Sequence, residues 1–238
     1  MLRVQGGDNA LEPPFLAYYY GEREKYPGYS SKSSKQFQKM LSQHSNTQKV
    51  SHATTVEFVR QALSSVASRL DGWFDASGTV LTEKPLDKSW SVAENLEHVA
   101  LTNHFLLKII RRHVGKALSR ASEGATAESE SNRFEDISAV RDRVSFYWKN
   151  PEHMMPSGKT PLGEVRTELR LQFSECQQLL DSMKEGEGHL NRVNLTVNNL
   201  GKLNMYEWLY FLSQHAMRHE DKISQAHPDR FVLSNENF

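Results

Sequence analysis

Hydrophobic residues recur at alternating steps of three and four positions in four long segments, a spacing that predicts helices with one buried face. The segments cover residues 54–73, 91–118, 161–183 and 204–227. In the first of them the buried stripe consists of Val56, Val59, Leu63, Val66, Leu70 and Trp73. No convincing strand pattern lies between the segments. The sequence therefore predicts an all-α fold, a four-helix bundle with long connections between helices two and three and between helices three and four.

Local start signals support these helices. A capping box pairs a small polar cap residue with a glutamate three positions later, and three segments begin with one: Thr54–Glu57, Ser91–Glu94 and Asn204–Glu207. In the third segment Thr160 is the expected cap and Pro161 the first helical residue, where a missing N–H costs nothing. Gly186 and Pro228 mark the ends of the third and fourth helices.

The bundle is expected to occupy residues 51–227. Residues 1–50 contain Gly–Gly and Pro–Pro pairs and a stretch rich in Ser, Lys and Gln, a composition that predicts a disordered N-terminal tail. Residues 228–238 are expected to form a loose C-terminal tail. A short helix is expected within residues 134–144, and an irregular loop over residues 189–203.

Overall composition excludes several classes of partner. The chain has 29 basic and 29 acidic side chains, so bulk charge gives no reason to expect binding to nucleic acid or to an anionic membrane. It has one cysteine, Cys176, which lies in the buried stripe of the third helix and fits a reducing compartment. No apolar run is long enough to span a bilayer, and the N-terminus lacks a secretory signal. We therefore expect a cytoplasmic protein.

Candidate chemistry lies in the fourth helix. His215 and His219 are four residues apart, in the same narrow stripe as Trp208, Leu212 and Ile223. An imidazole in a core needs partners for its ring nitrogens, and a divalent metal ion could serve both histidines at once. The pair alone is equally compatible with two surface histidines, or with core histidines that are hydrogen-bonded to hydroxyl groups. A metal site would need a third ligand from another part of the chain.

The second predicted helix contains a candidate third ligand, His98, but the sequence pattern does not show which way its side chain faces. Its main buried stripe contains Val92, Leu96, Val99, Asn103, Leu107 and Ile110. His98 lies roughly 120–140° away from this stripe on an ideal helical wheel, so periodicity leaves open whether it faces the core. His104 and His113 belong to no apolar ridge and are expected to face solvent.

Three sequence segments resemble the DinB-like family. The first is Trp90–His98, which is similar to a Trp-Ser-x-x-Glu-x-x-x-His signature; the others are the proline-rich entry at 156–162 and the closing helix from Leu200 to His219. The resemblance covers about residues 53–226 in the same order. It implies a four-helix bundle with a three-histidine metal site formed by His98, His215 and His219, and therefore that His98 faces the interior.

The resemblance implies a divalent metal ion as cofactor: zinc, nickel, iron or manganese. Three neutral imidazoles leave at least one coordination position open, as in catalytic zinc sites. A metal-dependent enzyme is therefore one expectation, either a hydrolase or a thiol-group transferase acting on a small molecule. The other expectation is a non-catalytic metal-binding or interaction module, with a homodimer as the expected assembly.

No catalytic residue can be assigned from the sequence. Many relatives have an acidic residue about a turn after the first histidine, but this chain has Asn103, which cannot accept a proton at neutral pH. Glu94 and Glu207 are the nearest charged candidates, and both are explained as capping residues. We expect the metal to be reached between the 151–160 and 189–203 loops, with Trp90, Trp208 and Asn103 as walls.

Overall fold

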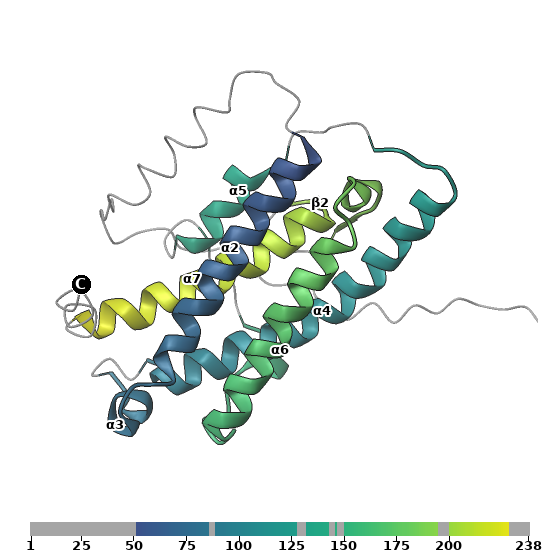
Figure 1. The fold of residues 1–238 in the computed structure, drawn as a ribbon. Coiled ribbons are helices and arrows are strands. Elements are labelled where there is room, and N and C mark those ends of the chain that lie inside the picture. The colour runs from purple at the N-terminus through teal and green to yellow at the C-terminus, as the bar shows by residue number, and fades with distance from the viewer. Residues whose placement is uncertain are drawn as a thin grey trace, which may run out of the picture.

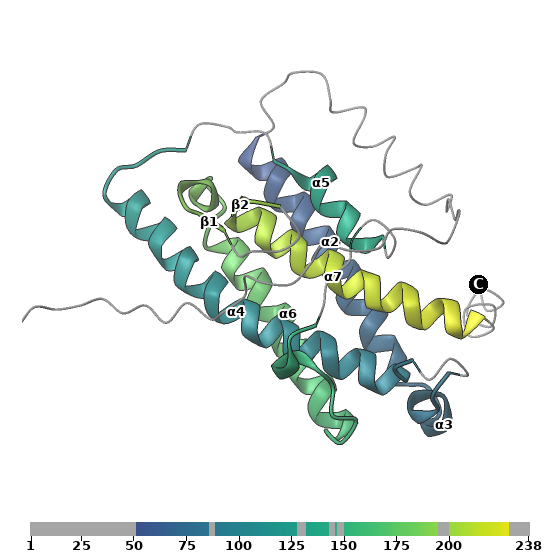
Figure 2. The ribbon, with the colours of Figure 1, turned by 180° about the vertical axis from the view of Figure 1, so that it is seen from behind.

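The computed structural model of the protein describes residues 51–85, 89–127, 132–142, 146, 150–194 and 200–228. The expected tail at 1–50 and almost all of the tail at 228–238 lie outside these residues. Within the described residues, four long helices form the bundle that the sequence predicts: α2 (His52–Trp73), α4 (Val92–Ser122), α6 (Leu162–Asp181) and α7 (Met205–Ala226). In Figure 1, α2 and α6 lie in front of α7 and α4, and Figure 2 shows the opposite side.

The four helices do not simply alternate in direction. α2 and α7 run in one direction, and α4 and α6 run in the opposite direction. Contacts near the helix ends show this. They are Arg60–Asp181 and Asp71–Arg166 between α2 and α6, Arg69–Glu220 between α2 and α7, and Asn95–His219 between α4 and α7. Because α4 and α6 are parallel neighbours, the chain between them has to return along the length of the bundle. This geometry explains the long connection between the second and third helices.

Short elements occupy the connections. α3 (Gly78–Thr82) precedes α4, while α5 (Phe134–Ser138) and η1 (Ala139–Arg141) pack against α7. The 3₁₀ helix η2 (Glu152–Met154) contacts α4, and η3 (Glu187–Leu190) follows α6. The short helix expected within 134–144 is thus present, and residues 143–144 of that range lie outside the described part.

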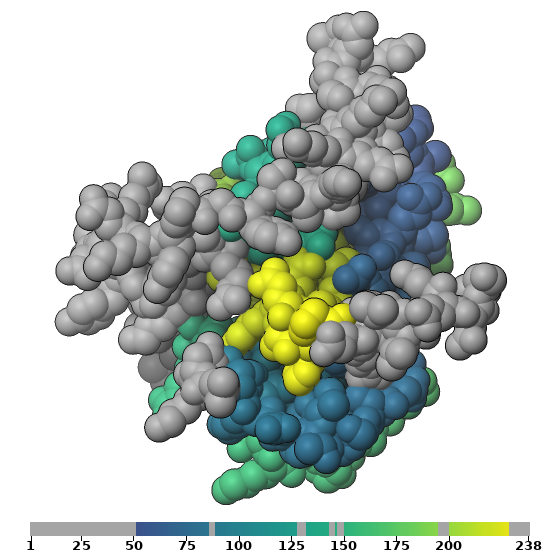
Figure 3. Space-filling model, turned by 90° about the vertical axis from the view of Figure 1, so that its left-hand side faces the viewer, coloured from purple at the N-terminus to yellow at the C-terminus, as the bar shows by residue number. Residues whose placement is uncertain are grey.

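The hydrophobic stripes form one core. Every residue of the predicted α2 stripe is buried, and Cys176 is fully buried in α6. α7 is buried around most of its circumference, because α2, α4, α5 and η1 all pack against it. Figure 3 shows one end of the molecule, where α7 in yellow lies between α2 and the blue segment that holds α3 and the start of α4. None of the helices in the described part of the chain is both long and apolar enough to cross a membrane.

Three local predictions were wrong. α2 begins three residues earlier than expected, with Ser51 as its cap; the Ser51 side chain accepts a hydrogen bond from the backbone of Thr54. α6 begins at Leu162 without a side-chain cap, because the Thr160 hydroxyl donates to Glu97 of α4 instead. The segment 189–203 is not wholly irregular, since β1 (Arg192–Asn194) pairs antiparallel with β2 (Lys202–Asn204).

Candidate metal centre

Helix α7 presents two histidines to the interior of the bundle. Its start is the predicted capping box: Asn204 accepts from the backbone N–H of Glu207, and the Glu207 carboxylate accepts from the backbone N–H of Asn204. From this fixed start, residues four apart face the same side. His215 is 2% exposed and His219 is 8% exposed, so both imidazoles lie in the core as the periodicity indicates.

Helix α4 supplies the third histidine from a stretch that is buried on all sides. Residues 95–100 are all buried, and His98 is 1% exposed. α7 covers one side of this stretch, and the segment from η2 to Thr160 covers another. His98 therefore faces the interior even though it lies off the main apolar stripe. The resemblance to the family implied this orientation, whereas the helical wheel left it open.

Glu97 holds the covering segment in place. Its buried carboxylate accepts hydrogen bonds from the Ser157 hydroxyl at 2.8 Å, the Gly158 backbone N–H at 2.8 Å and the Thr160 hydroxyl at 2.6 Å. Gly158 has φ +67°, a conformation that favours glycine, and it allows this N–H to point at the carboxylate. Burial alone would raise the pKa of Glu97, but the hydrogen bonds outweigh it and lower the pKa.

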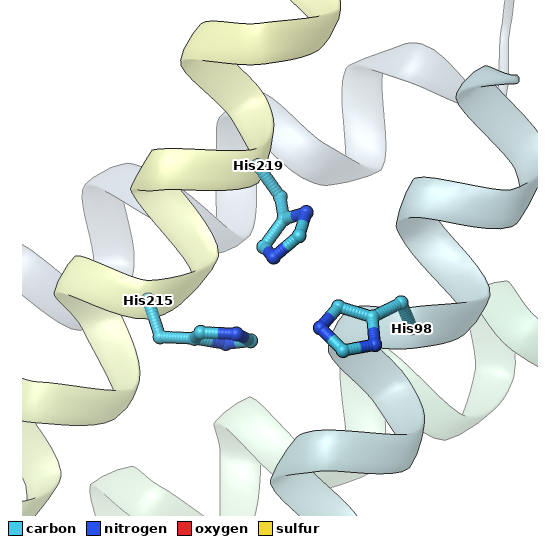
Figure 4. Close-up of side chains that lie close together, drawn as sticks. All are labelled: His98, His215 and His219. Atoms are coloured by element: carbon cyan, nitrogen blue, oxygen red, sulfur yellow. The ribbon is translucent and has the colours of Figure 1, made fainter. Parts of the chain in front are cut away.

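The three imidazoles converge on one point between α4 and α7. Figure 4 shows His98 from one helix facing His215 and His219 from the other. One nitrogen of each ring lies within 4.8 Å of the others. Nitrogens bound to one tetrahedral ion at about 2.1 Å lie about 3.4 Å apart. Small side-chain rotations would therefore close the group around an ion.

Hydrogen bonds orient two of the three rings. His98 Nδ1 lies 2.7 Å from the Met154 carbonyl oxygen, which can only accept, so this nitrogen carries the proton. His98 Nε2 is therefore the lone-pair nitrogen; it is buried and has no hydrogen-bond partner among the described residues. A buried lone-pair nitrogen without a hydrogen-bond partner is expected where a metal ion binds.

His219 has an equivalent partner in Asn95. The ring Nδ1 lies 3.0 Å from Asn95 Oδ1. The Asn95 amide group donates to the carbonyl oxygens of Trp90 and Ser91, which fixes its oxygen toward the histidine. His219 Nδ1 is therefore the donor, and its Nε2 is left available. Metal-ligating histidines commonly donate their second N–H to an oxygen in this way.

Burial also determines the charge of the three histidines. It lowers the pKa of His98 from 6.5 to about 4, with the positive charge of Lys222 adding to the effect. The pKa values of His215 and His219 are likewise held well below 6.5, mainly by burial and then by the neighbouring histidines. All three rings are neutral at pH 7, which is the state that binds a metal ion.

The surroundings differ in part from the expected ones. The Trp90 ring packs against His98 and His219, at centroid distances of 4.8 Å and 6.1 Å, so it is a wall of the site. Trp208 instead packs on Phe211 and donates to the Val193 carbonyl. Asn103 is fully buried, and neither polar atom of its amide has a hydrogen-bond partner among the described residues.

Of the two loops expected to flank the metal, only one lies near it. The 151–160 segment contacts His98 through Met154. The described parts of the 189–203 segment lie at the start of α7, where His189 contacts Asn204. His215 lies eleven positions after Asn204, which is about 16 Å along the helix. The described part of the 189–203 segment therefore does not line the metal position, and residues 195–199 lie outside the described part of the chain.

Carboxylates near the histidines have structural partners. Glu94 binds the backbone N–H of Ser91 and forms an ion pair with Lys84, Glu207 completes the α7 cap, and Glu97 holds the 157–160 segment. In the described part of the chain, the group that could hold a metal ion contains histidines alone. Asn95 and Glu97 were not predicted as residues of the site, because the only signal they give in the sequence is a polar side chain in a predicted helix.

Comparison with known proteins agrees with this description. The DinB superfamily matches residues 55–220, well over half of the chain and including all three histidines. Neither a curated protein nor a solved structure matches the chain. The family resemblance noted in the sequence is confirmed. The chain belongs to the DinB superfamily, as a helical bundle whose three buried histidines could hold a metal ion.

Proposed function

We propose that the protein is a metal-dependent enzyme that holds one divalent ion through His98, His215 and His219. The observation that carries this proposal is the lone-pair nitrogen of His98, which is buried, lacks a hydrogen-bond partner among the described residues and points toward the other two rings. Burial keeps all three rings neutral, and Met154 and Asn95 fix two of them in the orientation that a metal ion needs.

The number of ligands supports catalysis over a structural role. Structural zinc sites have four protein ligands, commonly including cysteine, whereas catalytic sites have three ligands and an exchangeable water. Cys176 is buried in α6 and does not belong to the histidine group. A divalent ion with an open position would activate a water, polarise a carbonyl or bind a thiolate. We infer a hydrolase or a thiol-group transferase with a small-molecule substrate.

Two observations favour a second candidate, a non-catalytic metal-binding or dimerising module. The nearby glutamates all have structural partners, and Asn103 stands where many relatives have an acidic residue. A site without a general base would have to rely on the metal-bound water or on a thiol substrate. Zinc, nickel, iron and manganese all suit imidazole ligands to some degree, so the donor set alone does not choose among them.

Cobalt-substituted protein distinguishes the two candidates. Azide, small thiols and small carboxylates are added while the visible spectrum of the cobalt is recorded. An open coordination position predicts that at least one of them changes the spectrum. A variant with the exposed His104 changed to Ala serves as the control and should respond like the original protein. A spectrum that no compound changes would favour the non-catalytic module.

A further inference from the structure

Helix α4 buries a hydroxyl group, that of Thr102, one turn after His98. The residue is 0% exposed, and its hydroxyl oxygen has no hydrogen-bond partner among the described residues. A threonine in a helix commonly donates to the carbonyl oxygen four positions earlier, as Thr167 does to Gly163 in α6. Thr102 makes no such bond. A buried hydroxyl group without a partner costs stability, which points to a role in binding.

Thr102 lies on the face of α4 that carries the histidine. It follows His98 by four positions, which places it about 40° away on a helical wheel, between the directions of His98 and Asn95. Both of these residues contact α7: Asn95 accepts from His219, and the His98 ring lies 5.4 Å from the ring of His215. Thr102 therefore faces α7 as well. Side chains in a helix lean toward its N-terminus, so the Thr102 side chain leans toward the histidine group.

The two sides of the histidine group differ along α4. Trp90 precedes the helix, and its ring packs against His98 and His219 at centroid distances of 4.8 Å and 6.1 Å. An aromatic ring therefore covers the side of the group that faces the start of α4. Thr102 lies on the other side of His98, toward the middle of the helix. A molecule bound on that side would meet a hydroxyl group.

The amide of Asn103 is also buried, but it lies on another face of α4. Its polar atoms lack hydrogen-bond partners in the described part of the chain. Asn103 follows His98 by five positions, about 140° away on a helical wheel, and so belongs to the hydrophobic stripe with Val99 and Leu107. Thr102 is therefore the better placed of the two residues to contact a molecule between the histidines.

We propose that the Thr102 hydroxyl donates a hydrogen bond to a small anion that occupies the open coordination position of the metal ion. No acceptor within the described part of the chain takes this hydrogen, and an anion bound to a metal ion keeps lone pairs that accept one. Hydrogen bonds to charged acceptors are stronger than those between neutral groups. Thr102 would then select for an anionic substrate group, such as a thiolate or a carboxylate. This inference rests on the proposed function, because it requires a metal ion at the three histidines.

The test measures the affinity of the cobalt-substituted, full-length protein for azide, from changes in the visible spectrum. Thr102→Val replaces the hydroxyl group with a methyl group, whereas Thr102→Ser keeps a hydroxyl group. Thr55→Val is the matched control: Thr55 is 2% exposed in α2, and its hydroxyl accepts from Asn132 at 3.0 Å. Urea denaturation of the metal-free proteins measures the stability of each variant.

Thr102→Val should still bind one cobalt ion per chain but should bind azide at least about tenfold more weakly than the original protein. Thr102→Ser and Thr55→Val should bind azide as the original protein does. Removal of a hydroxyl group without a partner should not destabilise the metal-free protein, whereas Thr55→Val should destabilise it because Asn132 loses an acceptor. The proposal is overturned if Thr102→Val binds azide as tightly as the original protein, or if it destabilises the metal-free protein as much as Thr55→Val does.

The experiment separates this inference from the proposed function. If cobalt binds and azide changes the spectrum equally in the original protein and in Thr102→Val, the role of Thr102 is refuted and the open metal position remains supported. If the original protein takes up no cobalt, or its cobalt spectrum does not respond to azide, the proposed open metal site is refuted and the role of Thr102 is refuted with it.

Discussion

The two ends of α7 both bury histidines among polar side chains, but the hydrogen bonding differs between them. Near the start of the helix, His189 Nδ1 accepts from the Asn204 amide at 3.1 Å, and the same amide also donates to Asn132 at 3.2 Å. The Glu207 carboxylate accepts from the backbone N–H groups of Asn204 and Arg133. The polar groups at this end bind one another.

Toward the other end of the helix, three imidazole rings converge on one point. His98, His215 and His219 face each other with nitrogens within 4.8 Å, and His98 Nε2 has no hydrogen-bond partner among the described residues. A buried polar network that satisfies itself holds a fold together, whereas one left incomplete costs stability unless a ligand completes it. The difference indicates a structural role for His189 and supports the proposal that the three histidines bind a metal ion.

Removing one histidine from each end of α7 tests this difference most directly. Replacing His215 with Ala should abolish stoichiometric metal binding, because two imidazoles do not close a site. Replacing His189 with Ala should leave about one ion per chain but lower the free energy of unfolding by about 2 kcal/mol, since Asn204 loses a buried partner. Metal analysis of the purified proteins and urea denaturation measure both effects. Full metal occupancy in the His215 variant would refute the site.

The features of α7 that the sequence predicts are local. The Asn204–Glu207 capping box joins residues three apart, and the stripe that contains His215 and His219 follows from helical geometry alone. The Ser91–Glu94 box of α4 is confirmed for the same reason. Such features depend on residues within about one helical turn of each other, so they can be predicted from the sequence without knowledge of the fold.

What the sequence could not predict depends on distant segments. His98 is buried because residues 151–160 cover α4. The oxygen that orients its ring belongs to the backbone of Met154, and a backbone oxygen cannot be recognised from the residue type. The position of Thr160 before Pro161 predicts a helix cap, but the Thr160 hydroxyl donates to Glu97, 63 residues away. Both features depend on contacts between residues far apart in the sequence, which local patterns do not reveal.

The stability of the metal-free protein should depend on pH, because His98 is buried as a neutral ring. The pKa of His98 falls from 6.5 when free to about 4 in the fold. Between these values the unfolded chain takes up a proton that the folded protein excludes, so stability is full above pH 6.5 and is lost as the pH falls toward 4. For His98 alone the loss should approach about 3 kcal/mol.

Urea denaturation at several pH values measures this loss. A His98→Gln variant should flatten the curve of unfolding free energy against pH by up to about 1.4 kcal/mol per pH unit between pH 4.5 and 6. An unchanged slope would show that His98 is not buried as a neutral ring. The low pKa also means that protons compete with the metal at a lower pH than the value of 6.5 for a free histidine indicates.

The smallest expected effect concerns Asn95, which touches no metal in the proposed site. Its oxygen accepts the Nδ1 hydrogen of His219, and its amide nitrogen binds the backbone of Trp90 and Ser91. Removing a partner of this kind typically weakens metal binding 10- to 100-fold. Asn95→Ala should therefore still bind one ion, but with an affinity lower by about tenfold or more, measured by competition with a chelator.

The control is the Asn132→Ala variant, which removes the amide that accepts from Asn204 at the other end of α7. This variant should keep the original affinity. If both substitutions weakened metal binding equally, the loss would reflect general destabilisation of the bundle, and the distinction between the two ends of α7 would not hold.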